Sequence, residues 1–441
     1  MANVTMTETK TAPAAAGTTQ SYGGAMAMVT TLFFMWGFLT CLNDILVPHL
    51  KAIFDLNYAG VMLIQFAFFL AYFLFSLPSG KVIEWFGYKR TMVTGLCTMG
   101  LGALLFIPAA TLPSYPLFLV ALMVLAGGMT LLQVSANPYV AVLGPPRTAS
   151  SRLNLTQAFN SFGTFIAPYV GSVLILSGAL LTAAEMKMLS PDQLHAYRVE
   201  QASSVKLPYL GFAIVLFLLA IVIAFYKLPV IESAEPHRGE LAKIQDSIWK
   251  HKNLLLGTIG IFVYVGGEVA IGSFLVNYMK EPYIAGMAEK LAAKYLMFYW
   301  GGAMVGRFIG SAILQRLATR KVLGVAATVA ALLTITSMVS TGHVAMWSIL
   351  AVGFFNSIMF PSIFTLGIDG LGKLTSRGSA ILIAAIVGGA IIPELQGLLA
   401  DRIGIHHAFI LPVLCYLYIV YFAMATHEIG QNPHAATEAV A

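Results

Sequence analysis

Apolar runs of about 20 residues recur along the whole chain, and each is long enough to cross a hydrocarbon core of roughly 30 Å as an α-helix. Lipid cannot hydrogen-bond a bare backbone, so spanning segments are either helices or barrel strands. The runs are continuous and lack the period of two that strands require, which favours helices. Only 10% of the residues are charged, compared with about 25% in soluble domains. The sequence therefore predicts an all-α membrane protein.

The breaks between the apolar runs divide the chain into twelve expected transmembrane helices, in two six-helix sets separated by a long charged connection. Such a division is typical of transporters built from internal repeats. The polar segment Glu185–Lys206 is expected to form a short amphipathic piece before the sixth span. The expected spans are 26–50, 60–80, 91–110, 116–142, 153–178, 208–227, 253–279, 292–315, 321–340, 344–368, 378–400 and 407–426. The expected organisation is a disordered cytoplasmic tail at 1–24, an N-terminal six-helix bundle at 25–227, a cytoplasmic linker at 228–252, a C-terminal six-helix bundle at 253–427 and a cytoplasmic tail at 428–441.

Lysine and arginine lie mostly in the short loops on one side of the expected spans. The segments on that side carry roughly twice as many of these residues as the other side, so the positive-inside rule places both termini in the cytoplasm. The net charge of +6 follows from this topology and does not indicate a nucleic-acid partner. We expect a monomeric, multi-pass protein of a bacterial inner membrane, surrounded by the lipid bilayer and without a cofactor or bound metal.

The segment after the second span combines glycines, a carboxylate and basic residues at Gly80, Glu84, Gly87, Lys89 and Arg90. This spacing resembles the loop signature of the major facilitator superfamily. We expect the glycines to allow helices to approach closely, and the charged residues to form a cytoplasmic latch between helices. The simpler alternative is an ordinary positively charged inner loop.

Four ionisable residues fall inside the expected spans: Asp44, Glu268, Arg307 and Glu394. Charged groups are costly inside a bilayer, so each is a candidate functional residue. Asp44 and Glu268 are the candidates for cation coupling, since burial favours the neutral form of a carboxyl group and so suits it to proton exchange. Alternatively, Asp44 is a structural residue that caps a helix or pairs with another polar group. Arg307 is expected to act as a structural latch, and Glu394 serves either gating or packing.

Several spans place amides and aromatic rings along one helical face. Amides hydrogen-bond hydroxyl groups and aromatic faces pack against the C–H groups of a sugar ring, so the mixture favours a neutral, polyhydroxylated ligand. The alternative for any single amide is an interhelical hydrogen bond worth about 0.6 to 2 kcal/mol. The candidate substrate-binding residues are Trp36 and Asn43 in the first span, Gln133 and Asn137 in the fourth, Gln157 and Asn160 in the fifth, Tyr264 and Glu268 in the seventh, and Asn356 in the tenth.

Longer sequence blocks point to one family. The blocks Asn43–Pro48, Ser135–Val140, Leu143–Pro145, Arg152–Gly163 and Pro361–Ile368 resemble the fucose/glucose/galactose–cation symporters of the major facilitator superfamily. The resemblance runs over essentially the whole membrane region. It implies cation-driven sugar uptake by alternating access, with Asp44 at the position of the essential first-span aspartate of that family.

One feature departs from the fucose permeases of this family. They have a second essential carboxylate in the fourth span, where this sequence has Gln133, which cannot titrate. Instead, Glu268 stands in the seventh span, where the fucose permease has an amide. This pattern resembles the glucose/galactose branch, and N-acetylglucosamine carriers are a similar branch. The resemblance therefore implies import of a neutral hexose or N-acetylhexosamine in symport with H⁺ or Na⁺.

Two other functions are compatible with the same fold. A cation-coupled exporter of drugs or metabolites would need a more apolar binding region, which the amide-rich fifth span disfavours. A non-transporting membrane sugar sensor would usually add a long cytoplasmic domain, whereas the expected C-terminal tail covers only 428–441. An intramembrane enzyme is disfavoured, because no His-Glu-x-x-His or Gly-x-Ser-x-Gly set lies on facing spans.

Overall fold

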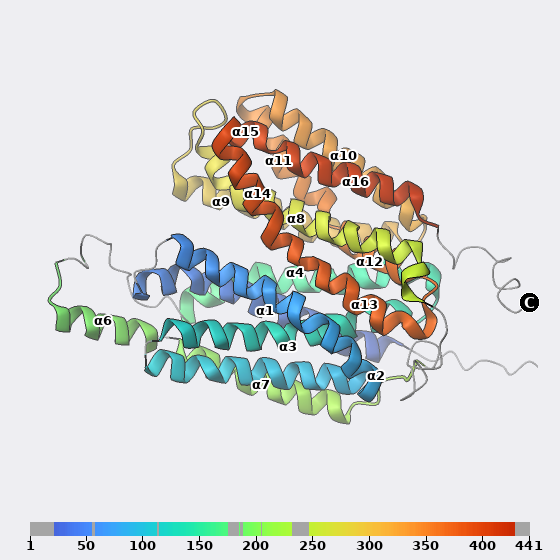
Figure 1. The fold of residues 1–441 in the computed structure, drawn as a ribbon, viewed down its shortest axis with the longest axis horizontal. Coiled ribbons are helices and arrows are strands. Elements are labelled where there is room, and N and C mark those ends of the chain that lie inside the picture. Colours follow the sequence, from blue (N-terminus) through green and yellow to red (C-terminus); the bar gives the residue numbers. More distant parts are fainter. Residues whose placement is uncertain are drawn as a thin grey trace, which may run out of the picture.

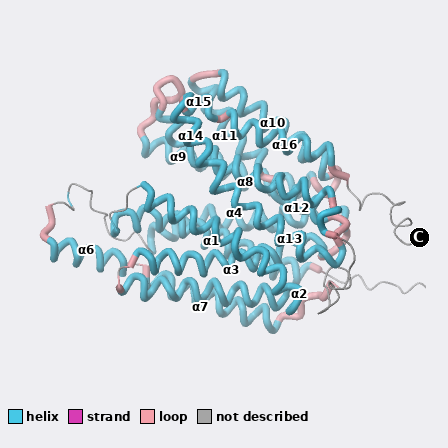
Figure 2. The backbone as a smooth tube through the Cα atoms, in the orientation of Figure 1, coloured by secondary structure: helices cyan, strands magenta, loops and turns pink. Residues whose placement is uncertain are grey.

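The computed structural model describes residues 22–54, 58–112, 114–174, 185, 188–203, 205–231 and 247–427, and the regular structure within them is helical (Figure 2). The helices form two groups, here called the N-half and the C-half. The N-half contains α1 (Gly23–Phe54), α2 (Tyr58–Thr111), α3 (Tyr115–Val142), α4 (Ala149–Leu174), α6 (Pro191–Ser203) and α7 (Lys206–Phe225). The C-half contains α8 (Lys252–Lys280), α9 (Glu289–Ile313), α10 (Thr319–Val339), α11 (Gly342–Asn356), α12 (Met359–Ile368), α13 (Thr375–Ala384), α14 (Gly388–Ile403), α15 (Ile405–Ala408) and α16 (Ile410–Ala425). Short 3₁₀ turns are η1 (Pro146–Thr148), η2 (Ile248–Lys250), η3 (Gly372–Leu374) and η4 (Ala385–Val387).

These helices correspond to the twelve expected spans. In the N-half, α2 supplies two spans, because it kinks at Gly87, where φ is 77° and ψ is 171°. Only glycine adopts such a backbone conformation without strain. With α1, α3, α4 and α7, the N-half has six spans. In the C-half, α8, α9 and α10 are single spans, while α11 with α12, α13 with α14, and α15 with α16 form three more.

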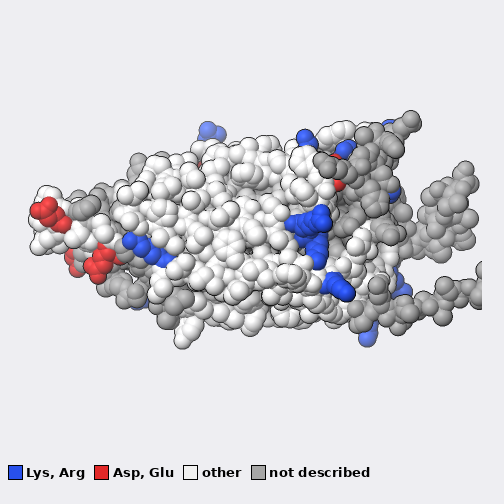
Figure 3. All heavy atoms as spheres, turned by 90° about the horizontal axis from the view of Figure 1, so that it is seen from below, with Lys and Arg blue, Asp and Glu red and all other residues white. Residues whose placement is uncertain are grey.

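The hydropathy of the spans agrees with a membrane location. In the part of the chain that the structure describes, nine helical stretches are long and apolar enough to cross a membrane, and Leu63–Thr111 is long enough for two crossings. Neither α4 nor α9 is among them. Both carry polar side chains that the sequence analysis singled out, and such residues normally face protein rather than lipid. On the face shown in Figure 3, uncharged side chains cover the middle of the molecule and charged ones gather toward its ends.

The segments that follow α7 and α16 lie at one end of the molecule, which we call the linker end. There the Tyr139 hydroxyl donates to the carbonyl of Pro229 at 3.0 Å, and the Asn253 amide donates to the carbonyl of His427 at 2.8 Å. The opposite end, where α6 and α15 lie, is called the α6 end. In Figure 1 the halves lie against each other at the linker end and spread apart toward the α6 end.

At the linker end, Arg152 closes the end of α3. The last carbonyls of a helix have no partner within the helix, and a cationic side chain can satisfy them. The Arg152 guanidinium donates to the carbonyls of Val140 at 3.2 Å, Ala141 at 2.7 Å and Pro145 at 2.9 Å. Gly144, with φ of 122°, turns the chain beneath this guanidinium. The Leu143–Pro145 and Arg152 blocks of the sequence therefore build the turn between α3 and α4.

The tenth span is broken between α11 and α12, at residues 357–358. Pro361 has no backbone N–H, so the carbonyl of Ser357 loses its partner four residues later. That carbonyl accepts from Nε of Arg307 at 3.3 Å, and the neighbouring carbonyl of Asn356 accepts from the Tyr264 hydroxyl at 3.0 Å. Side chains from α9 and α8 thus stabilise a break that Pro361 opens.

Three expectations about the elements differ from the structure or are refined by it. The loop expected between 80 and 91 is helical up to Gly87, and the expected continuous span 344–368 is interrupted at 357–358. The amphipathic piece expected before the sixth span is present as α6. The expected tails at 1–24 and 428–441 lie outside the described residues except for 22–24, so their disorder stays a prediction.

Candidate functional site

The predicted amides of α3 and α4 lie in the interior of the N-half. Gln133 and Asn137 are four residues apart and so share a face of α3. The Gln133 amide donates to the hydroxyl of Tyr72, on α2, at 2.7 Å. The Gln157 amide of α4 reaches the Oδ1 atom of Asn137 at 3.4 Å, and both side chains are buried. Three of the predicted residues are therefore brought together, with Tyr72 as a partner that the sequence did not reveal.

Asn160, also on α4, is directed toward α1. Its amide donates to the carbonyl of Phe33 at 2.9 Å, and the nearby Thr164 hydroxyl reaches the carbonyl of Gly37 at 3.3 Å. In this conformation the Asn160 side chain joins two helices, which is the alternative that applies to any single amide in a membrane. Its contact with a substrate stays a prediction.

The predicted residues of α1 divide into two groups. Trp36 is buried, and its ring centroid lies 4.1 Å from that of Phe33. Asn43 and Asp44 lie further along the same helix, but their side chains fall outside the described residues. The coupling role of Asp44 and the binding role of Asn43 therefore stay predictions.

A second polar group lies inside the C-half, and we call Tyr264, Glu268, Tyr299, Asn356 and Tyr416 the C-half polar cluster. The Asn356 amide donates to the Tyr299 hydroxyl at 2.8 Å, and that hydroxyl donates to the Glu268 carbonyl at 3.1 Å. The Tyr264 hydroxyl donates to the Asn356 carbonyl. These bonds link α8, α9 and α11. Three of the five residues were predicted from the sequence. Tyr299 and Tyr416 were not, because a tyrosine within an apolar span is indistinguishable from ordinary core packing.

The Glu268 side chain lies at the edge of this cluster. It is partly buried and lies within electrostatic range of the Arg307 guanidinium and of the Tyr264 hydroxyl. Among the described residues, its Oε1 atom is buried and has no hydrogen-bond partner. A buried carboxylate oxygen without a donor is costly, so this atom is available to a bound group.

Arg307 bridges the two halves. Its guanidinium donates to the Ser161 hydroxyl and to the Gln157 carbonyl at 3.4 Å, both on α4. It also donates to the Ser357 carbonyl of its own half. The expected structural latch at Arg307 thus takes the form of a contact between α9 and α4, next to one of the predicted substrate residues.

The glycines and charges of the predicted cytoplasmic latch lie at the linker end. Nε of Arg377, at the start of α13, lies 2.7 Å from Oε1 of Glu84. A Cβ atom on Gly80 would lie 3.0 Å from that of Ala380, so Gly80 lets α2 and α13 approach closely. The latch therefore joins the N-half to the C-half through Arg377. The parts that Lys89 and Arg90 play in the predicted latch stay predictions.

Small hydroxyl side chains seal the same end. Ser150 of α4 lies 2.5 Å from the Thr365 hydroxyl and accepts from the Thr319 hydroxyl at 3.0 Å. The Ser151 hydroxyl donates to the carbonyl of Ser311 at 2.7 Å, and the Ser311 hydroxyl donates back to the carbonyl of Ser151 at 3.1 Å. These contacts could not be predicted from the sequence, because isolated serines and threonines form no recognisable motif.

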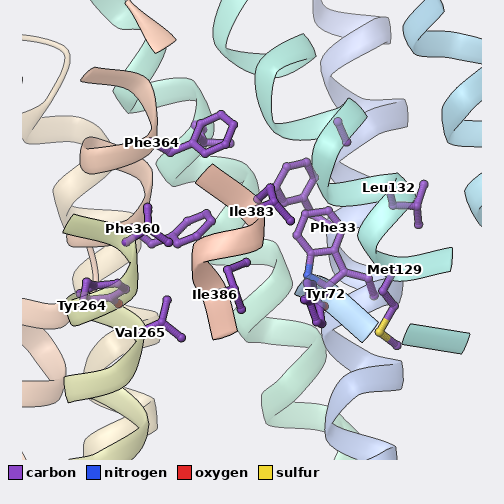
Figure 4. Close-up of a cluster of buried hydrophobic side chains, with 14 of the residues drawn as sticks. Phe33, Tyr72, Met129, Leu132, Tyr264, Val265, Phe360, Phe364, Ile383 and Ile386 are labelled. Atoms are coloured by element: carbon purple, nitrogen blue, oxygen red, sulfur yellow. The ribbon is translucent and has the colours of Figure 1, made fainter. Parts of the chain in front are cut away.

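Buried hydrophobic side chains form a cluster where the two halves face each other. Ile383 and Ile386, from the eleventh span, lie between the halves at this level (Figure 4). Figure 4 also shows Phe33, Tyr72, Met129 and Leu132 on the N-half side, and Tyr264, Val265, Phe360 and Phe364 on the C-half side.

Several known proteins resemble this chain in sequence and in structure. Residues 25–392 match the Major Facilitator Superfamily. The glucose/galactose transporter of Brucella abortus is 53% identical over 92% of this chain and 94% of its own length. The L-fucose-proton symporter of Escherichia coli is 36% identical over 95% of this chain and 96% of its own length. A crystal structure of the transporter FucP in the outward conformation superposes with a TM-score of 0.85, covering 92% of this chain and 99% of that one at 36% identity.

Proposed function

Because this chain belongs to the major facilitator superfamily, we propose that it imports glucose and galactose in symport with a cation. The observation that carries the proposal is the 53% identity to the glucose/galactose transporter of Brucella abortus, over nearly the full length of both chains. The buried amides of α3 and α4 supply matching chemistry, since they can hydrogen-bond the hydroxyl groups of a neutral hexose.

The N-half amides support a sugar site between the halves. The 3.4 Å separation of Gln157 and Asn137 is longer than a normal hydrogen bond, so a sugar hydroxyl can replace it at little cost. Among the described residues, Nδ2 of Asn137 has no hydrogen-bond partner. We assign sugar contacts to Gln133, Asn137 and Gln157 from the N-half. Asn43, Asn160 and Glu268 are further candidate contacts, with Trp36 against the ring. Asn356 and Tyr264, which the sequence also predicted to contact the sugar, are fully enclosed in the C-half polar cluster.

The structure supports loading from the α6 end. All the hydrogen bonds described above between α4 and the C-half involve residues 150–161, in the half of α4 nearer the linker end. We propose that the linker end faces the cytoplasm, with both termini on that side, as positive-inside counting predicts. In the state described here the cytoplasmic side is closed, and the sugar enters from the outside.

Cation coupling requires a carboxylate whose neutralisation permits reorientation. We propose Asp44 and Glu268 for this role, one in each half. A charged carboxylate resists transfer through an apolar region, because desolvation of a charge is costly. Binding H⁺ or Na⁺ removes that cost, so the loaded carrier can change conformation while the unneutralised one cannot.

The test is uptake of radiolabelled glucose into proteoliposomes that contain the purified full-length protein. We expect uptake against a concentration gradient when a proton or sodium gradient is imposed. Galactose should compete, and fucose and N-acetylglucosamine should compete less. Asp44→Asn should still exchange sugar across the membrane but should not concentrate it. Gradient-driven accumulation by Asp44→Asn would rule out that residue as the coupling group, and an absence of hexose uptake would rule out the function.

A further inference from the structure

The interior of the C-half holds three buried polar atoms that its own residues leave without a partner. Among the described residues, Glu268 Oε1, Asn356 Oδ1 and the Tyr416 hydroxyl make no hydrogen bond. The Tyr416 hydroxyl faces the Asn356 amide and lies within electrostatic range of Glu268. Native proteins rarely bury polar atoms without partners, so three of them in one cluster indicate a bound group.

The burial of the cluster limits the size of that group. Asn356, Tyr299 and Tyr416 are all 0% exposed, and Tyr264 is 1% exposed. A hexose cannot reach atoms that four fully enclosed side chains surround. The bound group must therefore be as small as an ion or a water molecule. Glu268 alone is partly exposed, so it offers one oxygen to the cluster and connects the cluster with the region between the halves.

The chemistry of the free atoms favours a cation. Glu268 Oε1 and Asn356 Oδ1 are acceptors, and the Tyr416 oxygen can also accept. Carboxylate, amide and hydroxyl oxygens are the ligands that hard cations take in proteins. A single carboxylate beside the Arg307 guanidinium carries too little negative charge to hold a divalent ion. We propose that the C-half polar cluster binds a monovalent cation of the size of Na⁺, held by Glu268, Asn356 and Tyr416.

The position of Arg307 couples cation binding at this site to the opening of the linker end. Its guanidinium and the cation compete for the same carboxylate. While the linker end is closed, Arg307 donates to Ser161 and to the Gln157 carbonyl across the halves, which leaves Glu268 available to the cation. When that end opens, Arg307 loses its α4 partners and pairs with Glu268, and the cation is expelled. Cation release is thereby tied to the conformational change.

This site deepens the proposed function, because it names Na⁺ as the coupling ion of the same carrier. The experiment therefore measures the cation without sugar. Full-length protein in lipid nanodiscs is titrated with radioactive sodium at fixed pH and constant ionic strength, with choline as the replacement cation. We expect saturable sodium binding and a higher thermal midpoint in sodium than in choline, because a ligand that binds only the folded state stabilises it.

Variants distinguish the site from general salt effects. Glu268→Gln should abolish sodium binding. Tyr416→Phe, which removes a single oxygen and keeps the ring, should weaken it by about tenfold. The matched control is Gln396→Met, because Gln396 is another fully buried side chain of the C-half without a hydrogen-bond partner among the described residues. Gln396→Met should bind sodium as the unmodified protein does.

The outcomes separate the cation site from the transport function. Absence of sodium binding, or equal sodium affinity in Tyr416→Phe and Gln396→Met, overturns the site and leaves the cluster as a place for water. If the same protein still accumulates hexose under a proton gradient without sodium, the proposed transport function holds although the sodium site is rejected. Sodium binding that Glu268→Gln abolishes, in a protein that takes up no hexose, supports the site and rejects the transport function.

Discussion

At the scale of single residues, the N-half amides differ in how far the protein already satisfies them. Gln133 makes a short bond to Tyr72, and Asn160 makes one to the backbone of α1. Among the described residues, the Gln157 side chain makes only the 3.4 Å contact with Asn137. A ligand gains the most binding free energy where it replaces a weak internal hydrogen bond and meets an unpaired donor, because no strong hydrogen bond of the protein is then lost. Gln157 and Asn137 are therefore the amides best placed to hold a sugar hydroxyl.

We expect Gln157→Ala to raise the KM for glucose by about two- to tenfold, since one buried hydrogen bond is worth about 0.5–1.5 kcal/mol. The maximal uptake rate should change less. Initial uptake rates into proteoliposomes over a range of glucose concentrations measure both quantities. Thr130→Val is a matched control, because the Thr130 hydroxyl is buried on α3 and bonds only its own helix, at the Ala126 carbonyl. An unchanged KM in Gln157→Ala would exclude it from the sugar site.

Local sequence patterns predict some of the functional residues but not their partners on other helices. Glu84 was identifiable because it stands in a local pattern with Gly80 and Gly87. Its partner Arg377 lies 293 positions away, and no local pattern links the two. The break at Ser357 follows from Pro361 four residues later, which is a local rule, but its stabilisation by Arg307 and Tyr264 depends on how the helices pack.

At the scale of helices, α1 and α4 are held together by close backbone contact. A Cβ atom on Gly37 would lie 2.2 Å from the Asn160 carbonyl, and one on Gly163 would lie 2.4 Å from the Phe34 carbonyl. Small residues at such positions let membrane helices approach and gain dispersion contacts. The same approach fixes Asn160 and Thr164 against α1. The polar face of α4 is therefore positioned by its packing on α1.

We expect Gly37→Ala to destabilise the protein by about 1–3 kcal/mol, because the added methyl group would overlap the backbone of α4. The thermal midpoint of the purified protein should fall accordingly. Gly211→Ala, on α7, is the control, since its Cβ atom would meet nothing within 4 Å. Alanine is the better helix former, so Gly211→Ala should melt at the same temperature or higher. Equal melting of the two variants would contradict the assigned contact.

The ion pair between α2 and α13 has a modest expected energy. The Glu84 and Arg377 side chains are 15% and 44% exposed, and partly exposed pairs contribute about 0.2–1 kcal/mol. We expect Glu84→Gln to shift the protein away from the state closed at the linker end. Labelling of a single cysteine placed between the halves at that end should become faster. The exchanged pair Glu84→Arg with Arg377→Glu should restore slow labelling, and a failure to do so would argue against a direct contact.

At the scale of the whole molecule, the fold followed from the sequence more completely than the site did. Hydropathy is a property of a single segment, so the twelve spans could be counted without knowing how they pack. The site depends on which helices face one another, and that information is distributed over the chain. Tyr299 and Tyr416 complete the C-half polar cluster from α9 and α16, and neither has a sequence neighbour that marks it.

The arrangement of the halves leads to a prediction about alternating access. The contacts between them at the linker end include Ser151 and Ser311, whose hydroxyl oxygens are 3.3 Å apart. If transport requires this end to open, a covalent bond at this point stops it. In a background in which Cys41, Cys97 and Cys415 are replaced, Ser151→Cys with Ser311→Cys should form a disulfide on oxidation. Glucose uptake into proteoliposomes should then be lost and should return with a reductant.

Binding distinguishes a locked carrier from a damaged one. The oxidised protein is held closed at the linker end and free at the α6 end, so it should still bind glucose with unchanged affinity in detergent. Ser151→Cys alone, treated with the same oxidant, should transport normally. Undiminished uptake by the fully cross-linked protein would mean that the halves do not separate here. Loss of both binding and uptake would point to distortion of α4, which carries Gln157 less than two turns from the cross-link.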